Sequence, residues 1–125
     1  MKQQPVIKIL KVEPDKAPQV IEIPNKLEEM QKIVGGHIEV FPLADGIAIV
    51  CNEEGKINGL KPNRPIYYDG KIVDIIFGTF FIAGDDISIG EFVSLTDEQI
   101  AKYSNQFFHP VTFVKMGREI IAIPR

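Results

Sequence analysis

Apolar and polar positions alternate or cluster along the first fifty residues in a way that predicts four strands. Residues 6–12 and 20–23 are apolar runs of strand length, and the proline-rich turn between them predicts a hairpin. Residues 37–43 alternate between apolar and polar side chains and are followed by Asp45-Gly46, a two-residue hairpin signal. The apolar residues 47–50 then predict the returning strand. Pro42 places the preceding strand at a sheet edge or at a bulge.

A helix is predicted between these two hairpins. Asn25 and Glu28 stand at the N-cap and N3 positions of a capping box. The apolar residues that follow recur at helical spacing and form one buried stripe, namely Leu27, Met30 and Val34. The glycine pair at 35–36 predicts a left-handed C-cap. Close approach of that glycine backbone to a ligand is the alternative.

The second half of the chain carries two further hairpin patterns. Residues 65–68 and 71–73 flank Asp69-Gly70, another two-residue turn signal. Residues 72–82 form the longest apolar run, and Gly78 near its middle predicts a bend, a bulge or a close backbone contact. A turn is expected at residues 84–86. Residues 111–115 and 119–123 predict a C-terminal hairpin.

A second helix is predicted from Thr96, with Gln99 as its N3 partner in a capping box. Its buried stripe consists of Ile100, Tyr103 and Phe107. His109-Pro110 ends it. Seven or eight short strands, two helices and no regular βαβ alternation therefore predict an α+β fold, in which two helices pack on a mainly antiparallel sheet.

Composition places the 125 residues in one globular domain, with 108–125 interpreted as an added hairpin. Hydrophobic residues make up 45% of the chain, and the net charge is −3. This charge argues against a nucleic-acid binder, and no apolar run reaches the length of a membrane span. Cys51 is the only cysteine, which excludes an intrachain disulfide and favours a cytoplasmic location. The first ten residues lack a signal-peptide pattern.

The polar stretch 51–64 is the candidate site, because loops on rigid strands commonly carry binding groups. Arginine side chains bind carboxylate or phosphate through a planar fork, and two prolines restrict the backbone around Arg64. The structural alternative for Arg64 is an ion pair with Glu53, Glu54 or Asp74, and for the whole stretch it is a solvated loop. The predicted ligand-binding residues are Asn52, Glu53, Asn58, Asn63 and Arg64.

Residues from about 6 to 107 resemble a small family of domains of unknown function. The resemblance rests on Asn52-Glu53-Glu54-Gly55, Asn58-Gly59-Leu60, Pro62-Asn63-Arg64 and Gly78-Thr79-Phe80-Phe81. Such domains are carried by phages, conjugative elements and genomes of Gram-positive and related anaerobic bacteria. The resemblance implies a mobile-element context and no particular chemistry.

The favoured function is a non-enzymatic accessory protein that binds a small, nucleotide-like anion at residues 51–64. The alternative is a protein-interaction module or an inhibitor of a host protein, with Phe107, Phe108 and Phe113 as candidate contacts. An enzyme is the least favoured class, because no catalytic residues are recognisable. We predict no cofactor and no metal site, since the two histidines have no cysteine or acid at ligand spacing. The oligomeric state stays open.

Overall fold

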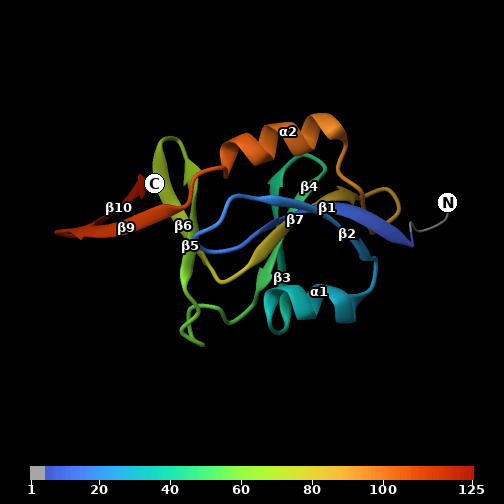
Figure 1. Cartoon of the computed structure of the whole chain (residues 1–125), viewed down its shortest axis with the longest axis horizontal. Coiled ribbons are helices and arrows are strands. Elements are labelled where there is room, and N and C mark those ends of the chain that lie inside the picture. The colour runs from blue at the N-terminus through green and yellow to red at the C-terminus, as the bar shows by residue number, and fades with distance from the viewer. Residues whose placement is uncertain (1–4) are drawn as a thin grey trace.

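The computed structural model describes residues 5–125, which form ten strands and two helices (Figure 1). Residues 1–4 lie outside the described residues. They begin the expected 1–125 domain and the segment in which no signal-peptide pattern was found. The number of strands is higher than the seven or eight predicted. The elements are β1 (Val6–Val12), β2 (Gln19–Pro24), α1 (Leu27–Val34), β3 (Ile38–Ala44), β4 (Ile47–Asn52), β5 (Pro62–Tyr68), β6 (Lys71–Phe77), β7 (Phe80–Asp86), β8 (Glu91–Val93), α2 (Asp97–Gln106), β9 (Val111–Met116) and β10 (Glu119–Pro124).

The central sheet has six strands, in the order β2-β1-β7-β4-β3, with β8 paired to the far end of β7. Every pair in it is antiparallel. The two predicted hairpins β1–β2 and β3–β4 are confirmed, and β7 joins them by pairing with both β1 and β4. As expected from Pro42, β3 is an edge strand, and its register shifts between Pro42 and Ala44.

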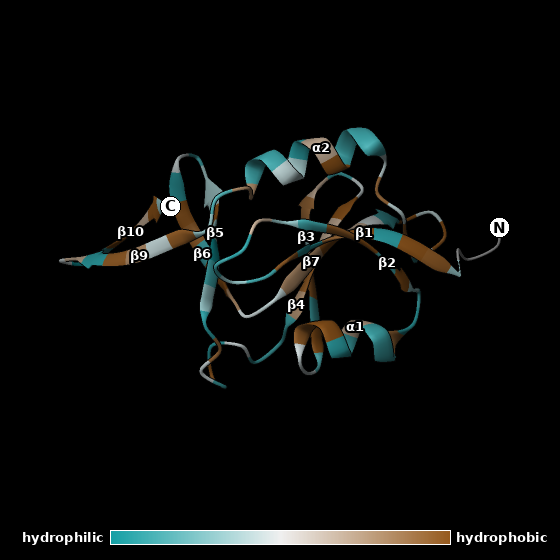
Figure 2. Cartoon of the chain, in the orientation of Figure 1, coloured by the Kyte–Doolittle hydropathy of each residue, from teal (hydrophilic) through white to brown (hydrophobic). Residues whose placement is uncertain are grey.

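The two helices cover opposite faces of this sheet, which gives a hydrophobic core on each side (Figure 1). On one face α1 inserts Met30 and Val34 among side chains such as Ile9 and Phe81. On the other face Tyr103 of α2 and Phe107 just after it pack over Leu10, Ile49, Phe80 and their neighbours. Because both faces are buried, the inner strands are apolar at nearly every position, as the hydropathy colours of Figure 2 show.

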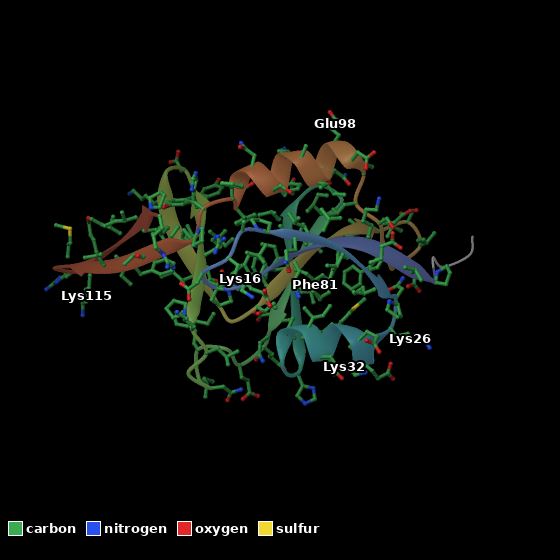
Figure 3. The ribbon with its side chains drawn as sticks, viewed as in Figure 1. Lys16, Lys26, Lys32, Phe81, Glu98 and Lys115 are labelled. Carbon is green, nitrogen blue, oxygen red and sulfur yellow. The ribbon has the colours of Figure 1, made fainter. Side chains whose placement is uncertain are left out.

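Apart from the buried Arg64, the charged side chains of the described residues keep some exposure to solvent. In Figure 3, Lys26 and Lys32 project outward near α1, Glu98 projects from α2, and Lys115 lies at the far end of the C-terminal hairpin. Phe81 occupies the middle of the molecule between the layers. Among residues 5–125, no helix combines the length and the hydropathy that a membrane span requires.

The capping signals were correct for one helix and wrong for the other. Thr96 caps α2 in a capping box with Gln99, as predicted. At α1 the N-cap residue is Lys26, without a side-chain cap. Asn25 instead donates to the Phe92 carbonyl of β8. The local pattern assigned the Asn25 side chain to the helix cap, but its amide donates to a strand carbonyl 67 residues away in the sequence.

Four other local predictions can be judged. Gly35 is the left-handed C-cap of α1, with φ of 79°, whereas Leu27 of the expected buried stripe is exposed. Gly78 has φ of 83° and separates β6 from β7, which belong to different sheets. The turn expected at residues 84–86 is wrong: β7 continues through Asp86 and the chain turns afterwards.

Two separate two-stranded sheets complete the fold, β5–β6 and β9–β10. Ile66 and Ile76 attach the first hairpin to the core beneath α2. The second hairpin projects from the end of the molecule opposite to the N-terminus, as Figure 1 shows at the left. The α+β class with a mainly antiparallel sheet of short strands and two helices is therefore confirmed.

Candidate functional site

The predicted site stretch divides into two environments. Residues 53–61 form the connection between β4 and β5, whereas Asn63 and Arg64 belong to β5 itself. The Asn52 side chain donates to the Val34 carbonyl at the end of α1, at 3.1 Å, and accepts the Glu54 backbone N–H at 2.8 Å. Asn52 therefore fixes where the loop leaves the sheet.

Asn63 is buried, with 1% of its surface exposed. Its amide nitrogen donates to the carbonyl oxygens of Val12 and Gly78, both at 2.9 Å. Its amide oxygen accepts a hydrogen bond from Arg64 Nη1, also at 2.9 Å. One side chain thus joins the end of β1 to the link between β6 and β7.

Arg64 is equally buried and is held by three hydrogen bonds. Besides the bond to Asn63, Nε donates to the Phe107 carbonyl at 3.1 Å and Nη2 donates to the Lys16 carbonyl at 2.6 Å. Burial lowers the pKa of Arg64 to about 10, and Arg125 acts in the same direction, while Asp15 opposes them. The guanidinium is still charged at neutral pH. It connects the β1–β2 turn, β5 and the end of α2, which is a structural arrangement. Its hydrogen-bond partners are carbonyl and amide oxygens, in place of the Glu53, Glu54 or Asp74 carboxylate expected for an ion pair.

A cavity of about 350 Å³ lies beside the same loop. None of the hydrogen-bond partners of Asn63 or Arg64 lines it, so those two residues and the cavity are separate features. Of the five predicted site residues, Asn52 and Glu53 reach the cavity, and Asn58 is exposed elsewhere on the loop. The cavity walls come from β3, the end of β4, loop residues 53–57 and β6, and the polar members of this lining are Glu39, Asn52, Glu53, Glu54, Lys56 and Asp74.

The loop closes over β6 at Gly55. A Cβ atom at this position would stand 2.7 Å from the Phe77 carbonyl oxygen, so only glycine allows the two backbones to approach this closely. One residue later, Lys56 places its ammonium 2.9 Å from Asp74 Oδ1. The same ammonium lies 5.8 Å from the centre of the Phe77 ring. The cavity wall therefore already holds one positively charged group between a carboxylate and an aromatic ring.

Cys51 lies directly opposite Glu39 in the β3–β4 pair, with its sulfur 3.8 Å from Glu39 Oε1. Burial raises the pKa of the Cys51 thiol to about 12, and the charges of Glu39 and Asp74 add to this effect. The thiol is therefore neutral at physiological pH and is a poor nucleophile. Within residues 5–125, no three His, Cys, Asp or Glu side chains are grouped so that they would hold a metal ion.

Sequence reasoning missed the cavity residues on the neighbouring strands. Glu39 and Phe41 lie two residues apart in β3 and therefore share one face of the strand. The alternation of residues 37–43 was the available signal for this shared wall. Asp74 and Phe77 lie within the apolar run 72–82, which predicted strand structure and no ligand site. No local pattern indicates that β6 would pass beneath residues 53–57.

The fold and cavity define a small α+β domain, with helices on both faces of an antiparallel sheet and an acidic cavity beside its central loop. A family model described as "Domain of unknown function (DUF3846)" matches residues 7–108, so the chain belongs to this family. This confirms the resemblance to a family of unknown function. Comparisons with curated proteins and with solved structures find no match. The C-terminal hairpin lies beyond the matched residues.

Proposed function

We propose that this protein is a non-enzymatic binding protein whose cavity takes a small molecule bearing a positively charged amine. The observation that carries the proposal is the position of the Lys56 ammonium, between the Asp74 carboxylate and the Phe77 ring. A carboxylate combined with an aromatic face is a favourable environment for an alkylammonium group. Lys56 acts here as an internal stand-in for the amine of a ligand.

The charge of the cavity supports a cation. Four carboxylates line it against the single ammonium of Lys56, namely Glu39, Glu53, Glu54 and Asp74. The expectation of an anionic, nucleotide-like ligand rested on Arg64, whose guanidinium is engaged by Asn63, Lys16 and Phe107 away from the cavity. A volume of about 350 Å³ suits a linear diamine or polyamine.

The cavity chemistry favours binding over catalysis. Cys51 lines the cavity and belongs to a residue type that can act as a nucleophile, but its raised pKa keeps the thiol protonated. The carboxylates supply charge and hydrogen-bond acceptors, which are sufficient to retain an amine without reacting with it.

Thermal shift and calorimetry with spermidine test this proposal, with magnesium chloride at equal ionic strength and adenosine monophosphate as comparison ligands. Spermidine at about 100 times its dissociation constant should stabilise the protein by about 2.7 kcal/mol. Asp74→Asn should abolish the shift. Lys56→Ala should strengthen binding, because it removes the competing ammonium.

The matched control is Glu98→Gln, which removes one carboxylate from the exposed surface of α2 (Figure 3). This variant should bind spermidine as the unaltered protein does. Equal stabilisation of the Asp74 variant, or stabilisation by the nucleotide instead of the amine, would refute the proposal.

A second candidate function is protein interaction, and one observation favours it. Of the fourteen exposed large apolar side chains in residues 5–125, eight gather around the two outlying hairpins. They are Tyr67, Tyr68, Val73, Phe108, Met116, Ile120, Ile121 and Ile123. Phe107, named with Phe108 as a candidate contact, is buried under α2, and Phe113 is half-buried. An accessory protein of a mobile element that acts on a host protein would use this end of the molecule.

A pull-down with the full chain and with Ile121→Asp as the matched control tests this second candidate. A partner that is recovered by the unaltered chain and lost with the variant supports it. Recovery by both proteins would place the contact elsewhere.

A further inference from the structure

The strand β10 has one unpaired edge, and the register of its hairpin shows which backbone groups lie there. Met116 pairs with Glu119 across the two-residue turn, and β9 is the single neighbour of β10. In such a hairpin the closing pair is hydrogen-bonded and the bonded pairs then alternate. The bond from the Arg125 N–H to the Pro110 carbonyl, at 2.8 Å, continues the same alternation. Ile120, Ala122 and Pro124 therefore direct their backbone groups away from β9.

An open groove of about 590 Å³ runs along this free edge. One wall consists of the consecutive residues 118–122, and the other consists of Tyr67, Gly70, Lys71 and Ile72 at the tip of the β5–β6 hairpin. Residues that share one face of a strand alternate in sequence, whereas consecutive residues share an edge. The groove therefore exposes the unpaired backbone of β10.

The composition of β10 protects this edge only at its C-terminal end, where Pro124 has no N–H. Ile120 and Ile123 are each 48% exposed, and Ile121 is 38% exposed. Exposed edge strands commonly carry a lysine or a bulge that blocks further pairing, and β10 has neither between Glu119 and Pro124. A two-stranded hairpin is also marginally stable by itself in water. Addition of a strand would both satisfy the backbone and bury the isoleucines.

We propose that the strand that enters this groove is β10 of a second copy of the chain, in antiparallel orientation and centred on Ala122. The proposal rests on the second candidate function, in which the hairpin end is an interaction surface, and it names the partner. The result is a four-stranded antiparallel sheet, with β9 and β10 from each copy. Such a contact is symmetric, because both subunits use the same surface.

The sequence of β10 is complementary to itself in this register. Ala122 faces Ala122 of the second copy, and Ile121 faces Ile123 of that copy. Glu119 faces Arg125 of the second copy, which places opposite charges at both ends of the pairing. Arg125 already contacts Asp15 and the Val111 carbonyl through Nη2, and its remaining N–H groups are available to Glu119. A parallel pairing would place the two Glu119 carboxylates opposite each other.

Backbone bonding agrees with the same register. The two Ala122 residues exchange two hydrogen bonds, and each Ile120 N–H donates to the Pro124 carbonyl of the other copy. Pro124 lacks an N–H, so this outer pair contributes one hydrogen bond in place of two, and the Ile120 carbonyl stays open to water. Pairing with a different strand would have to reproduce both the apolar centre and the charged ends.

Sedimentation analysis of the full chain between about 10 µM and about 1 mM tests the proposal. The unaltered protein should form a dimer within this range. Ala122→Pro removes an outward N–H and no bond to β9, so it should weaken dimerisation at least tenfold. The matched control Lys115→Pro makes the same change on the outer edge of β9 and should leave the dimer intact.

Charge exchange provides a second measurement that does not depend on proline. Glu119→Arg and Arg125→Glu should each weaken the dimer, and the double variant should restore it. A protein that is monomeric at every concentration, or a dimer that Ala122→Pro and both charge variants leave unchanged, would overturn the proposal. A monomer that still captures a host protein through Ile121 would overturn this inference while preserving the second candidate function.

Discussion

Replacement of Arg64 by alanine should destabilise the fold by about 3 kcal/mol. The substitution leaves two buried acceptors without their donor, Asn63 Oδ1 and the Phe107 carbonyl, and a partly buried one, the Lys16 carbonyl. Each buried acceptor without a partner costs about 1–3 kcal/mol. The estimate lies toward the lower end of the sum, because water can enter the vacated space and hydrate part of it.

Urea unfolding followed by circular dichroism measures this change. Arg64→Lys should recover only a small part of the loss, because an ammonium cannot reproduce the planar fork that reaches three acceptors. Asn63→Ala should cost about 2–3 kcal/mol, since it removes the donor to Val12 and Gly78. The control Arg118→Ala, at the exposed β9–β10 turn, should change stability by less than about 0.5 kcal/mol. A loss below about 1 kcal/mol for Arg64→Ala would show that this residue does not hold the fold together.

Two further predictions concern Cys51 and Gly78. Because its pKa is about 12, the Cys51 thiol should react with a thiol reagent at pH 8 far more slowly in the folded protein than in urea; equal rates would refute the burial argument. By linkage, the neutral Cys51 thiol contributes fully to stability below pH 9, which is the pKa of this thiol in the unfolded chain. The contribution is lost as the pH rises toward 12. A Cys51→Ala variant that loses stability equally steeply in this range would contradict the assignment. Gly78→Ala should cost about 2–3 kcal/mol by equilibrium unfolding, because the backbone is left-handed and a Cβ 2.6 Å from Leu60 Cδ1 would force that side chain to move. Gly59→Ala, left-handed in open space, should cost only about 1–2 kcal/mol, and equal costs for both variants would contradict the clash with Leu60.

Local sequence signals predicted most strands and most turns because their causes are local. Asp69-Gly70 adopts two positive φ angles at the tip of β5–β6, as its turn type requires. The side chains of Thr96 and Gln99 each accept a hydrogen bond from the backbone N–H of the other, so the whole cap lies within four residues. The same reasoning failed at Asn25, because the partner of its amide is Phe92 on a distant strand.

The candidate site was harder to predict for the same reason. Asn63 and Arg64 are polar and almost completely buried. Apart from each other, their hydrogen-bond partners lie 15 to 51 residues away in the sequence. The sequence could indicate that these residues are important without distinguishing a ligand from the main chain as their partner. Predicting the cavity would have required knowing that β6 passes beneath residues 53–57, and no spacing in the sequence specifies this path.

The distant partners of Arg64 also bear on the order of events during folding. The contacts to Lys16 and Phe107 close chain segments of 48 and 43 residues, so they form only after β1, β5 and α2 have come together. Interactions that are absent from the transition state affect unfolding rates rather than folding rates. Loss of Arg64 should therefore shorten the lifetime of the native protein while its refolding rate changes little, which makes this residue a determinant of kinetic persistence.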